Sequence, residues 1–212
     1  MDYNIYINVS NGGDFMENSI DVKTLAKSNG GIISTKVAIE NGISRMMLSK
    51  LCQAKVIERI ARGQYVLADD IQDEMLSIAI RSKNIIFSHE TALFLHGISD
   101  RTPFEHTITY PSGKVPSTAL YDECKIYFVK PELFDMGKTE LTTPMGNKVP
   151  GYDLERTICD IVRSRNKIGM ETFHAAMKMY VKRKDKDFNK LYEYAKQLRV
   201  QKIIRNYLEV LL

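Results

Sequence analysis

The sequence predicts an α+β protein of two domains. Two short helical patterns and a β-hairpin pattern follow one another between residues 30 and 68. Strand-like segments then fill residues 104–149, and helical patterns return over residues 153–212. The chain has 212 residues, of which 44% are hydrophobic, so it can supply the cores of one or two domains.

Two serines mark the starts of two short helices in the N-terminal part. Ser34 and Ser44 each precede a short apolar run. A serine hydroxyl at such a boundary can accept a hydrogen bond from a free backbone N–H of the first helical turn. Asn41-Gly42 lies between the two patterns, and both residue types tolerate the positive φ of a sharp turn. The spacing predicts a helix-turn-helix, supported by an earlier helix from about Asn18 to Ser28.

The second helix of this pair has two contrasting faces. Its apolar face consists of Met47, Leu48 and Leu51. The opposite face carries side chains that can bond to base edges or phosphates, namely Arg45, Ser49, Lys50 and Gln53. Arg45 lies in the first turn, which in a recognition helix usually enters the major groove. A cation there gains nothing from the helix dipole, so a role outside helix stability is favoured.

A basic β-hairpin pattern follows directly. Residues 56–60 and 64–68 are rich in β-prone side chains, and Gly63 can supply the left-handed position of a three-residue loop. Arg62 is expected at the exposed tip with Arg59 nearby, where a wing could touch the DNA backbone. An ordinary hairpin with solvated arginines is the plainer interpretation.

The order of caps, turn, polar helix face and basic hairpin favours a winged helix-turn-helix that binds duplex DNA. Lys36 joins the two hairpin arginines as an expected phosphate contact. The complete set of predicted DNA-binding residues is Lys36, Ser44, Arg45, Ser49, Lys50, Gln53, Arg59 and Arg62.

Residues 30–36, 42–45, 48–51 and 57–67 resemble the N-terminal domain of AbiEi-type antitoxins. Residues 86–100 resemble the segment that follows the wing in that family, which makes the resemblance more specific. The family comprises transcriptional regulators of bacterial type IV toxin–antitoxin systems, which act in abortive infection and so in phage defence. The resemblance implies an antitoxin that represses its own promoter by binding inverted repeats. It also implies that the chain antagonises an AbiEii-type nucleotidyltransferase toxin without forming a stable complex with it.

We expect a winged DNA-binding domain over residues 1–69 and a mixed α/β antitoxin domain over residues 70–212. An amphipathic helix over residues 71–83 would link the two, and Ser88 could cap the helix after it. The remainder is expected to be β-containing at 104–149 and helical at 153–212, with one long helical stretch from Asp187 to Leu212.

The C-terminal third is the most basic part of the chain. Residues 146–212 hold 15 Lys and Arg against 8 Asp and Glu. Its densest basic run contains Lys182, Arg183, Lys184 and Lys186. A solvated loop between helices is one interpretation of this run. A secondary contact to DNA phosphate, or to the RNA or protein of the toxin system, is an equally good one.

Other chemistry finds little support in the sequence. Gly-rich phosphate loops and nucleophile elbows do not occur, so neither an enzyme nor a cofactor is expected. His89 and His96 are seven residues apart but have no clear third metal ligand, so helix packing is favoured over a metal site. Neither a membrane span nor a secretory signal is apparent, so a cytoplasmic protein is expected. The alternatives are a DNA-processing nuclease with a winged targeting domain and a plain repressor without a toxin partner.

Overall fold

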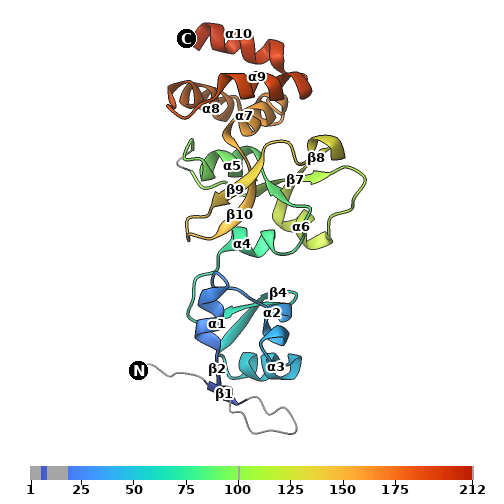
Figure 1. Cartoon of the computed structure of the whole chain (residues 1–212), viewed down its shortest axis with the longest axis vertical. Coiled ribbons are helices and arrows are strands. Elements are labelled where there is room, and N and C mark those ends of the chain that lie inside the picture. The colour runs from blue at the N-terminus through green and yellow to red at the C-terminus, as the bar shows by residue number, and fades with distance from the viewer. Residues whose placement is uncertain (1–5, 9–18, 100, 212) are drawn as a thin grey trace. The chain divides into compact units, whose positions relative to one another are not determined.

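The structure, a computed structural model, describes residues 6–8, 19–99 and 101–211 of the chain (Figure 1). It divides into two compact units, Met1–Ser77 and Ile78–Leu212. Helices and β-sheets occur together, which confirms the predicted α+β class. The sequence placed the domain boundary earlier, after residue 69. The boundary in sequence, between Ser77 and Ile78, falls within helix α4 (Glu74–Ala79).

Helix α4 is shorter than the helix expected over residues 71–83. Its start is fixed by Asp73, whose Oδ1 accepts a hydrogen bond from the N–H of Leu76 at 3.0 Å. An aspartate that accepts a hydrogen bond from a first-turn N–H caps the N-terminus of the helix. The chain then turns after Ala79, where the N–H of Arg81 donates to the carbonyl of Ile78.

The N-terminal unit combines short helices with small antiparallel sheets. In its described part, β3, β5 and β4 form one sheet in that order, and β1 pairs with β2. The elements before α4 are β1 (Tyr6–Asn8), β2 (Ser19–Asp21), α1 (Val22–Ser28), β3 (Ile33–Ser34), α2 (Thr35–Glu40), α3 (Arg45–Gln53), β4 (Ile57–Ala61) and β5 (Gln64–Leu67). The helix expected from Asn18 therefore begins only at Val22, because residues 19–21 pair with β1 as a strand.

Both predicted helix caps are confirmed. The Ser34 hydroxyl accepts a hydrogen bond from the N–H of Val37 at 3.1 Å, and the Ser44 hydroxyl accepts one from the N–H of Met47 at 3.2 Å. The turn between α2 and α3 uses Gly42 at φ 79°. Gly63 takes the left-handed conformation in the β4–β5 loop at φ 74°, as predicted. Local sequence signals therefore fix the path of the chain from α2 to β5.

One apolar core holds the N-terminal unit together. Leu48 and Leu51 of α3 are buried in it, while Met47 packs at its edge. The other buried members are Val22, Leu25, Ala26, Ile33, Ala38, Ile43 and Ile57. Since α3 buries this face, its opposite face is left to solvent.

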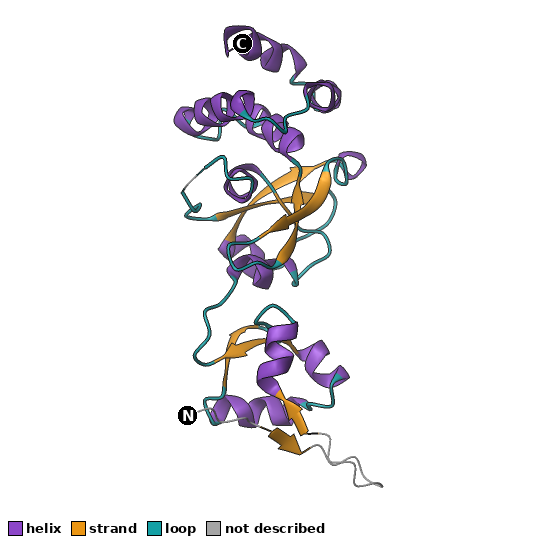
Figure 2. Cartoon of the chain, turned by 60° about the vertical axis from the view of Figure 1, so that its left-hand side comes forward, coloured by secondary structure: helices purple, strands orange, loops and turns teal. Residues whose placement is uncertain are grey.

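A mixed five-stranded sheet lies at the centre of the C-terminal unit (Figure 2). Its strand order is β8-β7-β6-β10-β9, with parallel pairs at β7–β8 and β6–β10. The strands are β6 (Ile86–Phe87), β7 (His106–Pro111), β8 (Cys124–Val129), β9 (Lys138–Thr142) and β10 (Lys148–Tyr152). The expected β-region at 104–149 thus holds most of the sheet, together with α6 (Thr118–Glu123) and a 3-10 turn at Pro131–Leu133. Strand β6 was not anticipated, because two residues are too few to show a period.

The helices of the C-terminal unit are α5 (His89–Leu95), α7 (Leu154–Arg163), α8 (Met170–Lys182), α9 (Phe188–Gln197) and α10 (Gln201–Leu211). Helices α7 to α10 gather at one end of the sheet in both views (Figures 1 and 2). Helix α7 contacts α5, α8, α9 and α10, and the residues from Leu154 to Val162 are all buried. It is therefore the central helix of this unit.

The stretch from Asp187 to Leu212, expected as one helix, is two helices. Arg199 adopts a left-handed conformation at φ 60°, which breaks the stretch between α9 and α10. The break lets Leu198 and Val200, on either side of Arg199, both enter the core. Within the described residues, none of the helices combines the length and apolar character that crossing a bilayer would need.

Candidate nucleic-acid interface

The polar face of α3 is exposed to solvent, opposite the buried Leu48 and Leu51. It contains the four side chains that the sequence singled out for base contacts, Arg45, Ser49, Lys50 and Gln53. No acidic residue lies in the first turn of α3. The face therefore offers hydrogen-bond donors and positive charge along one side of a short helix, which suits base edges and phosphates.

Ser44 has a structural task at the start of this helix. It is exposed, but its hydroxyl oxygen accepts the Met47 N–H and so caps α3. Removing such a cap costs about 1 kcal/mol of helix stability. Ser44 thus fixes where α3 begins, and with it the position of Arg45.

The hairpin tip is attached to the start of α2. The backbone N–H of Thr35 donates to the carbonyl of Gly63 at 2.8 Å, and the Thr35 hydroxyl donates to the same oxygen at 3.3 Å. A side chain at position 63 would come within 3.1 Å of the Thr35 hydroxyl, so glycine suits this close approach as well as the turn. These bonds hold Lys36 and Arg62, the neighbours of the bonded residues, in adjacent segments.

The three expected phosphate contacts are exposed but differ in how free they are. Lys36 forms an ion pair with Glu40 at 3.8 Å, in which both side chains are largely exposed. Such a pair is weak and easily exchanged for a phosphate. The Nε of Arg59 donates to the carbonyl of Ala61 at 3.3 Å, where the β4–β5 register shifts. Arg62 makes no side-chain bond within the described residues and is the freest of the three.

Two exposed apolar side chains complete the surface around the helix pair. Met46, beside Arg45 in the first turn of α3, is 69% exposed, and Ile39 on α2 is 50% exposed. Apolar groups in a major groove can contact the methyl group of thymine. Met46 was not among the site residues predicted from the sequence.

Comparison with known proteins bears on the same segment. Residues 21–68 match the family described as "Transcriptional regulator, AbiEi antitoxin". Residues 21–68 are thus similar to an AbiEi-type domain, and we refer to this segment as the AbiEi-type domain. The resemblance seen in the sequence is thereby confirmed for the segment that contains α1, the helix pair and the hairpin.

The fold beyond the AbiEi-type domain also has a precedent. The crystal structure of the RV2827C protein from Mycobacterium tuberculosis is similar to this chain with a TM-score of 0.63. The similarity covers 88% of this chain and 75% of that one at 14% sequence identity, so it shows a shared fold alone. No curated protein matches the sequence.

The basic run outside the AbiEi-type domain is more structured than a solvated loop. Arg183 binds both carboxylate oxygens of Asp185, at 2.7 and 2.6 Å, and its Nη1 donates to the carbonyl of His96 at 2.8 Å. Lys186 donates to the carbonyl of Arg183. Asp185 raises the pKa of Arg183, and Arg183 in turn lowers the pKa of Asp185 to about 2. Lys182 and Lys184 remain exposed, so they are the better candidates for a contact to phosphate.

The two histidines singled out in the sequence make separate contacts. His96 Nε2 lies 2.9 Å from the carbonyl oxygen of Tyr152. His89 is buried and lies between the hydroxyls of Ser88 and Ser164, with its ring stacked on Tyr127. Ser88 precedes α5, as expected, but makes no side-chain cap. In the described residues, His, Cys, Asp and Glu do not gather in threes as a metal site would require.

Proposed function

We propose that the AbiEi-type domain is a winged helix-turn-helix that binds duplex DNA. Helices α2 and α3 would form the helix-turn-helix, with α3 as the recognition helix and the β4–β5 hairpin as the wing. The observation that carries the proposal is the exposed basic and polar face of α3, in a unit whose hairpin tip is bonded to the start of α2. Cations on the helix pair and on the hairpin would then contact one duplex.

The proposed roles differ between the two sets of residues. Arg45, Ser49, Lys50 and Gln53 would face the major groove, where Arg and Gln can bond to two atoms of one base. Lys36, Arg59 and Arg62 would contact phosphates, which fix orientation without reading sequence. Ser44 would act through the cap that positions α3.

Arg45→Ala tests the recognition helix. Loss of a base-reading arginine should weaken binding to the promoter DNA by about 1–3 kcal/mol and relax the preference at one base pair. The measurement is fluorescence anisotropy with the promoter site and with single-base variants of it. Lys27→Ala, which removes the same charge from α1, is the control and should leave the sequence preference intact. Unchanged affinity and preference in Arg45→Ala would refute the assignment of α3.

We further propose that the chain is an antitoxin that represses its own promoter by binding inverted repeats. Its functional antagonist would be an AbiEii-type nucleotidyltransferase toxin, with no stable complex between the two proteins. The support is the AbiEi-type match over residues 21–68. The proposal assigns no catalytic role to the chain, and binding to promoter DNA would locate it in the bacterial cytoplasm.

The two proposed activities should be separable by truncation. The proposed DNA-binding elements end with β5, whereas the larger C-terminal unit has its own sheet and core. We therefore expect residues 78–212 to rescue growth when expressed beside the toxin, and residues 1–77 to bind DNA without rescue. Rescue by residues 1–77 alone would instead assign antitoxicity to repression of toxin transcription. Circular dichroism of both fragments is the control for folding.

The basic run of the C-terminal unit is proposed as a secondary DNA contact. Lys182→Glu/Lys184→Glu should reduce DNA affinity in a salt-dependent manner, because exposed cations act through counterion release. Lys196→Glu/Lys202→Glu, which reverses two exposed lysines on α9 and α10, is the control. Equal binding of the first variant and the intact protein at low salt would show that the run only surrounds the structural contact of Arg183 with His96.

A further inference from the structure

A cavity of about 570 Å³ opens in the C-terminal unit, far in sequence from the proposed DNA-binding residues. One wall is the strand β8, from Lys125 to Val129. Another is the helix α7 with the turn that follows it, from Arg156 to Lys167, and His89 closes the cavity from α5. We refer to it as the α7–β8 cavity.

The lining of the α7–β8 cavity is rich in cations. Lys125, Arg156, Arg163 and Lys167 line it, and Asp160 is the one acidic side chain among the lining residues. Asp160 is already bound to Arg156, whose Nε donates to its Oδ2 at 3.0 Å. Within the described residues, Arg163 and Lys167 make no side-chain hydrogen bond or ion pair. Lys125 forms an ion pair with Glu90, which is not a lining residue, at 3.8 Å. Arg163 and Lys167 are therefore the lining cations that no carboxylate of the described residues neutralises.

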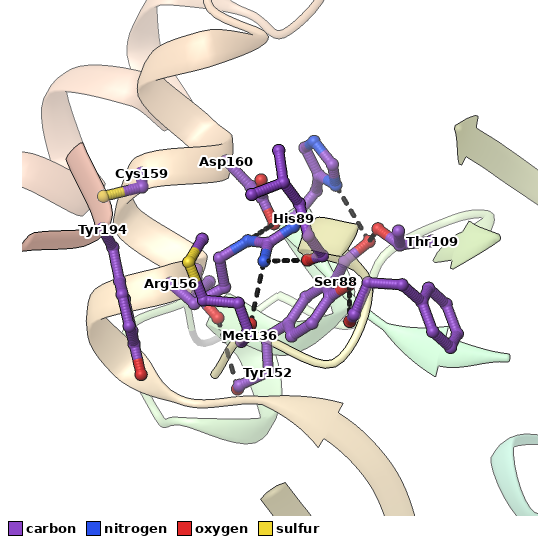
Figure 3. Close-up of polar contacts among 12 residues, drawn as sticks. Ser88, His89, Thr109, Met136, Tyr152, Arg156, Cys159, Asp160 and Tyr194 are labelled. Atoms are coloured by element: carbon purple, nitrogen blue, oxygen red, sulfur yellow. Dashed lines mark hydrogen bonds and ion pairs between the residues drawn. The ribbon is translucent and has the colours of Figure 1, made fainter. Parts of the chain in front are cut away.

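Arg156 differs from the other lining cations in being completely buried (Figure 3). Its side chain is 0% exposed, and its guanidinium lies over the ring of Tyr152 at 4.1 Å. Nε bonds Asp160, and Nη1 donates to the carbonyls of Leu133 and Met136 at 2.7 and 2.8 Å. Nη2 is buried and has no hydrogen-bond partner within the described residues. A buried guanidinium nitrogen without an acceptor is costly, and a bound anion would supply one.

His89 adds a polarised chain of hydroxyls that ends at the same cavity. The Thr109 hydroxyl donates to Ser88 Oγ at 2.9 Å, which leaves the Ser88 hydroxyl to donate to His89 Nδ1 at 2.9 Å. His89 Nε2–H then donates to Ser164 Oγ at 3.0 Å, so the Ser164 hydroxyl proton is free for a ligand. Burial, followed by the charges of Arg156, Lys125 and Arg163, lowers the pKa of His89 well below its usual value and keeps it neutral. This series of hydrogen bonds thus presents the Ser164 hydroxyl to the cavity as a donor.

The backbone at His89 is also unusual. It is a non-glycine residue at positive φ, 48°, at the first position of α5. Side chains rarely adopt this region, and such strain is concentrated at binding and catalytic sites. Here the strained residue is the one that links the hydroxyl chain to the cavity.

Helix stability alone does not account for the cations. Cations near the C-terminus of a helix offset its dipole, and Arg163 lies in the last turn of α7. Arg165 already interacts with the C-terminal end of α7, because its Nη1 donates to the carbonyl of Val162 at 3.1 Å. Lys125 lies on a strand and Arg156 in the first turn of α7, where the dipole disfavours a cation.

We propose that the α7–β8 cavity binds the diphosphate or triphosphate group of a small ligand. Arg156 Nη2 and the Ser164 hydroxyl would donate to phosphate oxygens from inside the cavity. Lys125, Arg163 and Lys167 would balance the remaining negative charge. The volume exceeds what a single phosphate would fill and is within the range of small-ligand sites. Phe128, 45% exposed on the cavity wall, offers an aromatic face for a base.

Isothermal titration of the full-length protein at fixed ionic strength tests the proposal. Inorganic pyrophosphate, ATP and GTP are the probes, each titrated to about 1 mM. At least one is expected to bind, and Arg163→Gln/Lys167→Gln should weaken that binding at least tenfold. Nucleotide binding at least tenfold tighter than that of pyrophosphate would identify a nucleotide as the source of the phosphates. Equal binding of nucleotide and pyrophosphate would show that the diphosphate group alone is sufficient for binding.

Two controls separate this site from general charge effects. Lys202→Gln/Arg205→Gln removes a matched pair of exposed cations from α10, outside the cavity, and should change the dissociation constant less than twofold. Ser164→Ala removes one donor without changing charge and should weaken binding by itself. The proposal fails if none of the probes binds. It also fails if Arg163→Gln/Lys167→Gln, with an unchanged circular dichroism spectrum, binds as tightly as the intact protein.

Discussion

Arg156→Met is expected to lower the free energy of unfolding of the C-terminal unit by about 3–5 kcal/mol, because it leaves the buried carboxylate of Asp160 without its partner. The same change removes the donor for the carbonyls of Leu133 and Met136. Methionine fills part of the space but cannot donate to any of these oxygens. Arg156 therefore joins α7 to the segment between β8 and β9, and its removal should loosen the packing between them.

Urea unfolding followed by circular dichroism measures the change, and hydrogen exchange of the α7 amides assigns it to the C-terminal unit. Arg205→Met on α10 is the control, since an exposed arginine should change stability by less than about 0.5 kcal/mol. Asp160→Leu in the Arg156→Met background should restore only part of the stability, because the two carbonyls stay without a donor. Equal stability of Arg156→Met and the intact protein would contradict the structural role of this arginine.

The second large effect is expected from the proposed phosphate contacts. Lys36→Ala/Arg59→Ala/Arg62→Ala should weaken binding to specific and unrelated DNA alike. It should also lower the slope of log K against log salt by about one unit for each phosphate that is no longer neutralised. Arg62 should account for the largest share, because Lys36 has to leave Glu40 and Arg59 is bonded to the backbone of Ala61.

The measurement is anisotropy titration over a series of salt concentrations, with promoter DNA and a scrambled duplex. Lys27→Ala/Lys83→Ala/Lys130→Ala removes three exposed charges outside the helix pair and hairpin and should preserve the slope. If the two triple variants behaved alike, net charge would explain the binding and the wing contact would have no support.

The sequence predicted the N-terminal unit well because its signals are local. The hydroxyls of Ser34 and Ser44 bond to N–H groups three residues away, and Gly42 and Gly63 adopt positive φ within their own turns. The polar face of α3 could be predicted from helical spacing alone, and the exposure of its residues follows from burial of Leu48 and Leu51. Each of these features depends on fewer than ten neighbouring residues.

The C-terminal unit was harder to predict because its determinants are distant in sequence. In the sequence, Arg156 and Asp160 have the spacing of a surface ion pair one helical turn apart. In the structure Arg156 is buried and donates to the carbonyls of Leu133 and Met136, more than 15 residues earlier in the chain. Strand β6 pairs with β7 on one side and with β10 on the other, so its place depends on residues 106–111 and 148–152. The α7–β8 cavity needs β8, α5 and α7 together, so none of these segments reveals it alone.

Footprinting of the intact protein on the DNA upstream of its own gene is the sharpest test of sequence reading by α3. Two protected half-sites related as an inverted repeat are expected. Arg45→Ala should lose this protection at concentrations where the intact protein still gives it. Protection spread evenly over the fragment, or none at concentrations that saturate binding to unrelated DNA, would contradict a sequence-reading role for α3.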